Sequence, residues 1–140
     1  MEISEVRKRL LGTIERSKQA AAQRRAHVDE ATRDYQIFLD RIAVPLFRQL
    51  ANALKAHGYP FQVFTPGGSV RLMSDRNAED FVELLLDTSG SEPVVVGRSS
   101  RLRGRRVIEA ERSLGSAVAE IDEEQVLAFL LSELEPHVER

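Results

Sequence analysis

FQVFTPGGSVRLMSD (residues 61–75) is the stretch of sequence that decides the fold. Apolar side chains recur at every second position before and after the segment Pro66-Gly67-Gly68, which is the spacing of strands that bury one face. The two glycines tolerate the positive φ angles that a tight connection requires. The stretch therefore predicts two antiparallel strands separated by a turn.

Three further segments downstream have the character of strands: DFVELLLDT (80–88), PVVVGRS (93–99) and RRVIEAERS (105–113). Short connections separate all five segments, whereas a parallel pair of strands requires a crossover of roughly a dozen residues or more. We therefore predict an antiparallel meander of five strands.

The sequence upstream of Gly58 has helical periodicity, with apolar residues at steps that are mostly three and four. Pro45 lacks a backbone N–H and clashes with the carbonyl four residues back. We therefore predict a break or kink near residues 41–44, between one helix that runs to about Asp40 and a second from about Ala43 to His57, with Gly58 ending the second helix. The apolar stripe of these helices comprises Ile3, Val6, Leu10, Ile14, Ala21, Val28, Ala31, Tyr35, Phe38, Ile42, Leu46, Leu50 and Leu54.

The chain ends in a further predicted helix that opens at Asp122. Asp122 and Gln125 have the spacing of a capping box, and an apolar face follows them. That face comprises Val126, Leu127, Leu130, Leu131, Leu134 and Val138. The order of elements predicts an α+β fold: a long N-terminal helix and second helix, a five-stranded antiparallel meander sheet and a C-terminal helix. We expect residues 1–140 to form a single domain.

The first predicted helix is too long for the domain that carries it. About 37 residues at ~1.5 Å each give ~55 Å, whereas a domain of this size has a radius of gyration of ~14 Å. Residues 1–40 should therefore project, and a projecting apolar stripe needs a partner, most simply a second copy of the chain. We expect self-association, with a dimer favoured, through residues at coiled-coil spacing. These are Val28, Ala31, Tyr35, Phe38 and Ile42.

The composition limits the classes of function. Of the 140 residues, 42% are hydrophobic and 30% charged, and the net charge is −2, as in ordinary globular proteins. The absence of cysteine excludes thiolate metal sites and cysteine nucleophiles. No apolar run approaches the roughly 18–20 residues of a membrane span, and the N-terminus lacks the apolar core of a signal peptide. We therefore expect a cytoplasmic protein with no membrane contact.

A dense basic cluster occupies GRSSRLRGRRV (97–107). With Arg98 ending the fourth strand and Arg101 and Arg103 in the turn, all its guanidiniums would lie at one edge of the sheet. Such a cluster suits a phosphate group or a nucleic-acid backbone. No aromatic residue interleaves it, and the chain is slightly acidic, so a solvated hairpin paired with nearby acids is favoured over nucleic acid. The candidate anion-binding residues are Arg98, Ser99, Ser100, Arg101, Arg103, Arg105 and Arg106.

The second face of the predicted sheet is mixed in character. Strand alternation places Phe64, Met73 and Leu85 there among polar residues. A face of this kind is either covered by a partner or ligand, or wet. Both possibilities remain open from the sequence.

The sequence contains no recognisable catalytic, metal-binding or nucleotide-binding motif. The three histidines, His27, His57 and His137, fall in different predicted elements without metal-ligand spacing. There is no nucleophile elbow, Walker A motif or dinucleotide fingerprint. We expect no cofactor and no metal, and the leading hypothesis is a non-enzymatic oligomerising or partner-docking module. The alternatives are nucleic-acid or phosphoanion binding by the arginine cluster and small-ligand binding on the mixed sheet face.

Overall fold

A computed structural model describes residues 1–115 and 117–139 and confirms the α+β class. Helices precede and follow a sheet whose strands are consecutive in the chain. The elements are α1 (Ile3–Phe38), the π-helical turn η1 (Leu39–Ala43), α2 (Val44–Ala56), β1 (Phe61–Phe64), the 3-10 turn η2 (Pro66–Gly68), β2 (Val70–Ser74), β3 (Phe81–Asp87), β4 (Val94–Arg103), β5 (Arg106–Ser113), the 3-10 turn η3 (Val118–Glu120) and α3 (Glu123–Val138).

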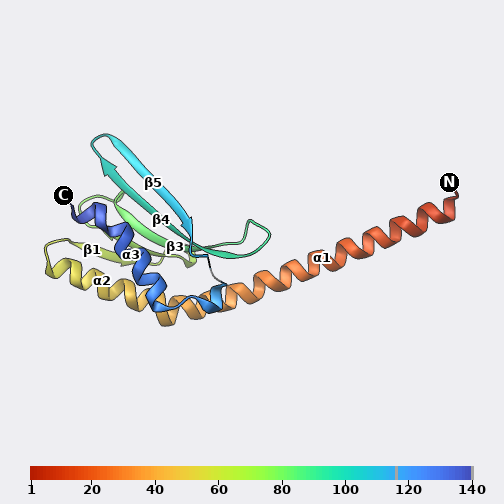
Figure 1. Ribbon diagram of the computed structural model, residues 1–140, viewed down its shortest axis with the longest axis horizontal. Helices are drawn as coiled ribbons and strands as arrows, with labels where there is room; N and C mark the ends of the chain where they lie inside the picture. Colours follow the sequence, from red (N-terminus) through yellow and green to blue (C-terminus); the bar gives the residue numbers. More distant parts are fainter. Residues whose placement is uncertain (116, 140) are drawn as a thin grey trace.

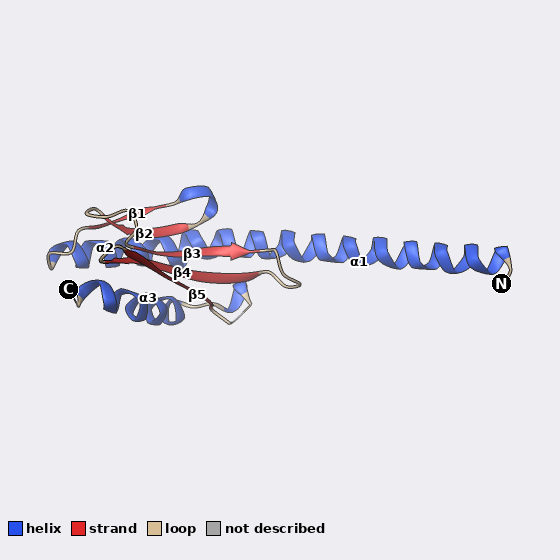
Figure 2. Ribbon diagram, turned by 90° about the horizontal axis from the view of Figure 1, so that it is seen from above, coloured by secondary structure: helices blue, strands red, loops and turns tan. Residues whose placement is uncertain are grey.

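The sheet is an antiparallel meander in the order β1-β2-β3-β4-β5, as the short connections predict (Figure 2). Its register pairs Leu72 with Val82 and Leu84 with Gly97 on the face that the helices cover. β1 and β5 are the edge strands, and nearly all of β5 is exposed. The hairpin of β4 and β5 rises away from the helices (Figure 1).

The two predicted helices are present, and the irregularity expected before Pro45 takes the form of a bend and not of a break. Val44 donates its N–H to the carbonyl of Leu39, five residues back, and the chain passes through a π-helical turn into α2. Pro45 then stands at the start of α2, where a missing N–H is tolerated. The wide turn accommodates the proline without ending the helix. As a result α1, η1 and α2 form one continuous, bent rod (Figure 1).

The helix ends follow the signals in the sequence. Gly58 has φ of 89°, and behind it the Tyr59 N–H donates to the Leu54 carbonyl at 2.8 Å, which closes the end of α2. At the start of α3 the Asp122 carboxylate accepts the Gln125 N–H at 2.9 Å. The Gln125 side chain accepts the Asp122 N–H at 3.1 Å in return. The predicted capping box is therefore confirmed.

The core lies between the helices and one face of the sheet. α2 packs on β1 and β2, and α3 packs on β3 and β4. Phe47, Leu84 and Leu130 are fully buried in it. The Tyr35 hydroxyl donates to the carbonyl of Leu84 at 3.3 Å, which ties α1 to the middle of the sheet. Burial raises the pKa of the Tyr35 phenol far above its usual value, and the nearby Glu83 carboxylate adds to this rise, so the hydroxyl keeps its proton.

Gly97 allows α3 to approach the sheet closely. The ring of Phe129, which is 3% exposed, lies against the backbone of Gly97 in β4. A Cβ atom at position 97 would stand only 2.2 Å from Cζ of that ring. The glycine is therefore required by packing and not by a special backbone angle.

Gly97→Ala should lower the free energy of unfolding by about 1–3 kcal/mol, because the extra methyl overpacks a closed core. Chemical denaturation measures the loss. Gly90→Ala is the matched control: its nearest neighbour would be the Glu92 carbonyl oxygen at 3.9 Å, so its effect should stay within about 0.5 kcal/mol. Adding Phe129→Leu to Gly97→Ala should recover part of the loss. Equal stabilities for the two glycine variants would contradict the close approach.

Candidate functional sites

The arginine-rich segment does not form the single cluster that the sequence predicts. β4 continues to Arg103, so Arg98 lies in mid-strand and Arg101 lies in the strand instead of the turn. Because side chains alternate along a strand, Arg98 shares a face with Ser100, while Ser99, Arg101 and Arg103 face the helix side. Arg98 is thus separated from Arg101, Arg103 and Arg106, which share the helix-side face because Arg106 pairs with Arg103.

The other arginines lie at the outer end of the hairpin. Arg105 and Arg106 are exposed at the turn that follows Gly104. On the helix side, Arg101 and Arg103 line an open hollow together with Glu139, just beyond the end of α3. A carboxylate is therefore already close to part of the cationic group.

A buried carboxylate organises the sheet face that the helices leave uncovered. Glu83 is only 3% exposed. Its carboxylate accepts hydrogen bonds from Nε of Arg71 at 2.9 Å and from the Ser69 hydroxyl at 3.3 Å, and Nη1 of Arg98 donates to it at 3.5 Å. The Arg71 guanidinium also stacks 4.1 Å above the ring of Phe81. We call Glu83, Arg71, Arg98 and Ser69 the charge node.

The charge node has one carboxylate and two arginines, and Glu111 on β5 balances the second arginine. Arg71 lies opposite Glu83 in the register, Glu83 lies opposite Arg98, and Arg98 lies opposite Glu111 on β5. Acids and bases therefore alternate across neighbouring strands, an arrangement that stabilises strand pairing. The cavity beside the node has a volume of about 200 Å³, below the roughly 300–1,000 Å³ of small-molecule sites. This geometry favours a role in holding the sheet together over a role in binding anions.

The three residues of the sheet-face patch do not form one apolar surface. Phe64 is 41% exposed, while Met73 and Leu85 are half-buried. Met73 lies beside Phe81, but Leu85 pairs with Val96 on the far side of the charge node. The charged pairs thus divide the patch, which weakens the case for a ligand there.

The predicted self-association residues occupy two environments. Tyr35 and Phe38 are buried in the core of their own chain, whereas Val28, Ala31 and Ile42 are half-buried. This part of α1 packs on η3 and the sheet, so its apolar face is used within the chain. Phe38→Asp should therefore destabilise the single chain itself, because it would place a carboxylate in the core.

Exposed apolar residues lie instead near the start of α1. We call residues 3–26 the arm; they precede His27, whose Nδ1 lies 3.9 Å from Oε2 of Glu92 in the loop after β3. The arm extends away from the rest of the molecule (Figure 1). Its apolar side chains are between 40% and 80% exposed. These side chains, the arm stripe, are Ile3, Val6, Leu10, Leu11 and Ile14.

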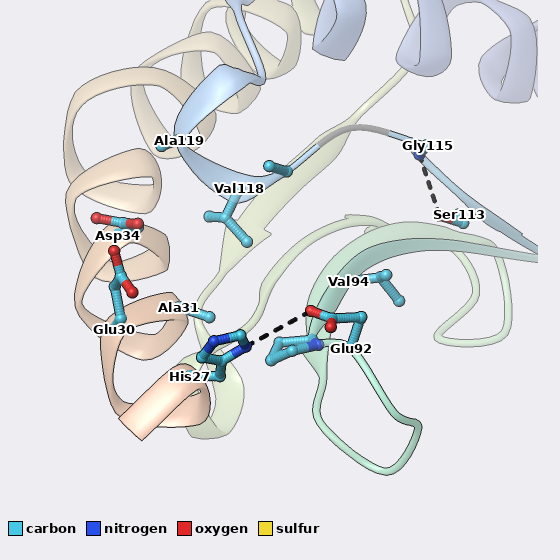
Figure 3. Close-up of a pocket in the computed structure, with 12 residues that line it drawn as sticks. His27, Glu30, Ala31, Asp34, Glu92, Val94, Ser113, Gly115, Val118 and Ala119 are labelled. Atoms are coloured by element: carbon cyan, nitrogen blue, oxygen red, sulfur yellow. Dashed lines mark hydrogen bonds and ion pairs between the residues drawn. The ribbon is translucent and has the colours of Figure 1, made fainter. Parts of the chain in front are cut away.

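An acidic cavity of about 490 Å³ lies where α1 passes the sheet (Figure 3). His27, Glu30 and Asp34 line it from successive turns of α1, and Glu92 lines it from the facing loop. Val118 of η3 forms part of its apolar wall. Within the described residues, no group of three acids, histidines or cysteines is arranged to hold a metal ion. The excess of carboxylates suits a cation or a basic side chain and repels anions.

An apolar groove runs between α2 and α3, with a volume of about 600 Å³. Leu131 on its rim is 54% exposed although it belongs to the predicted apolar face of α3. The sequence indicated an additional apolar surface here, because the predicted apolar face of α3 includes Leu131, which the core does not bury. The groove is lined by Leu50, Ala53, Leu54, His57, Tyr59, Leu131, Leu134, Glu135 and Val138.

Comparison with protein-family models, with curated proteins and with solved structures finds no match for this chain. Over the described residues, no helix is long and apolar enough to cross a membrane.

Glu83→Gln should lower the free energy of unfolding by about 1–3 kcal/mol, because it leaves two arginines of the charge node without their shared carboxylate. Denaturant titration of the purified protein measures the change. The control is Glu111→Gln, which removes an exposed carboxylate opposite Arg98 and should change the stability by less than about 0.5 kcal/mol. If Glu83→Gln is no worse than its control, the charge node does not stabilise the sheet.

Proposed function

We propose that this protein is a non-enzymatic, self-associating module whose arm binds a second copy of the chain. The observation that carries the proposal is the arm stripe. Ile3, Val6, Leu10 and Ile14 follow one another at steps of three and four, so they lie along one side of the helix. An apolar helix face that projects from the body is a typical protein-binding surface.

The stability of the arm supports the same proposal. An isolated helix is marginally stable in water, and most helical stability in proteins comes from packing of an apolar face. Within the arm, the Arg9–Glu5 pair at 3.0 Å is exposed on the surface and contributes only about 0.3–0.5 kcal/mol. Burial of the arm stripe against another chain supplies the packing that the arm lacks within its own chain.

The two alternatives receive less support. For nucleic acid or a phosphoanion, Arg98 is separated from the arginines of the helix-side face and is engaged by Glu83. For a small ligand on the sheet face, the cavity is small and the apolar patch is divided by charged pairs. Self-association is therefore the function that the exposed surface supports best.

Leu10→Glu should convert the protein to a monomer at micromolar concentration, because a carboxylate would have to be buried at the centre of the arm stripe. Light scattering after size exclusion, across a range of concentrations, measures the mass. Gln23→Glu is the control, since it adds the same charge on the opposite side of the exposed arm and should leave the mass unchanged. A wild-type protein that is monomeric throughout the range contradicts the proposal.

The nucleic-acid alternative makes a separate prediction. If the outer arginines followed a phosphate backbone, binding of generic DNA or RNA would be detected at about 20 mM salt and would fall steeply as salt is added. We expect no binding with tens of micromolar protein under these conditions. Binding that is weakened by the double variant Arg103→Ala and Arg105→Ala would restore this alternative.

A further inference from the structure

We infer that the groove between α2 and α3 is the receptor for the arm of a second copy, an inference that rests on the proposed self-association. The groove and the arm stripe are apolar surfaces left open on the same chain. Docking of an amphipathic helix into a groove between two helices is a common mode of recognition.

The groove has the size and lining that a helix requires. Its walls are Leu50 and Leu54 from α2 and Leu131 and Val138 from α3, with Tyr59 beyond the end of α2. From residue 131 to residue 138 the α3 wall rises ~10 Å, about two helical turns. Two turns receive three successive positions of an arm stripe whose members recur every three or four residues.

The arm of the same chain cannot occupy the groove. α1, η1 and α2 are continuous, so the arm leaves the body at one end of the rod while the groove lies toward the other end (Figure 1). Between residues 26 and 50 the rod rises ~36 Å along its axis. The occupant of the groove must therefore come from another molecule.

The charges favour the groove over a second arm as the partner. Within residues 3–18 there are five bases, Arg7, Lys8, Arg9, Arg16 and Lys18, and two acids, Glu5 and Glu15. Of the four glutamates of α3, Glu135 lines the groove, while Glu133 pairs with Arg112 at 3.2 Å. The two bases of α2, Arg48 and Lys55, line a different hollow beside β1. Pairing of an arm with an arm brings like charges together, whereas pairing with α3 brings opposite charges together.

Reciprocal contacts between two copies would produce a closed dimer. Each chain has one arm and one groove, so two copies can each insert an arm into the groove of the other. Two such contacts related by a two-fold axis satisfy both surfaces and leave none open for further addition. A dimer is therefore the expected product.

Disulfide cross-linking tests the contact directly, because the chain has no cysteine of its own. Equal amounts of a Leu10→Cys protein and a Leu131→Cys protein are mixed, oxidised and analysed by mass spectrometry of the linked peptides. Two sites that meet in a complex react at an effective concentration of about 1 mM, against about 10 μM for sites that meet only by collision at that protein concentration. The link between Leu10→Cys and Leu131→Cys should therefore exceed by about 100-fold the link formed when Gln23→Cys replaces Leu10→Cys.

A second measurement does not depend on cross-linking. Leu131→Glu introduces a charge at an exposed position of the groove and should raise the dimer dissociation constant by about 30-fold or more. Ser132→Glu adds the same charge at the next exposed position of α3, which does not line the groove, and should leave the constant within about threefold of wild type. Circular dichroism verifies that both variants are folded.

The possible outcomes separate this inference from the proposed function. A dimer in which Leu10→Cys links only to other arms, and which tolerates Leu131→Glu, overturns the groove as receptor and leaves self-association standing. A wild-type protein that stays monomeric overturns both. Preferential linkage of Leu10→Cys to Leu131→Cys, together with loss of the dimer in Leu131→Glu, establishes the arm-in-groove contact.

Discussion

The missing N–H of Pro45 is the constraint on which the shape of the molecule depends. The chain answers it with one π-helical turn, in which Val44 bonds to the carbonyl of Leu39. A true break would leave the direction of α1 relative to α2 unfixed. Because the helix continues instead, the arm is held away from the sheet and its apolar side chains stay open to another molecule.

The sheet provides the fixed base to which that rod is attached. On one face, Gly97 admits the Phe129 ring and brings α3 close. On the other face, Glu83 draws Arg71 and Arg98 into one network that joins three neighbouring strands. Packing and charge thus stabilise opposite faces of the same strands, so the sheet needs no second layer to cover it.

Periodicity predicted the elements of this fold but not how their surfaces are shared. The twofold and 3.6-fold repeats identified the three α-helices and the five strands, because burial on one face imposes those repeats on the sequence. They did not reveal the π-helical and 3-10 turns or the extension of β4 to Arg103. The same repeat runs through the arm stripe and through Phe38, yet one is exposed and the other is core. Which part of a helical stripe is buried depends on where the helix lies against the sheet, and the repeat alone does not contain that information. Similarly, the groove joins Leu54 and Leu131, which are distant in sequence, and no local pattern specifies their meeting.

The exposed outer strand β5 has a consequence for how copies of this chain meet. An unpaired strand edge is a template for continuous sheet growth and aggregation. Suppose that the β5 strands of two copies pair antiparallel about a two-fold axis. Each residue then lies opposite a residue that points to the same face of the sheet. In the two registers with the longest overlap, this sets Glu109 against Glu109 or against Glu111 of the other copy. Repulsion between these carboxylates discourages such growth, so the protein can expose a bare strand edge without promoting sheet extension there.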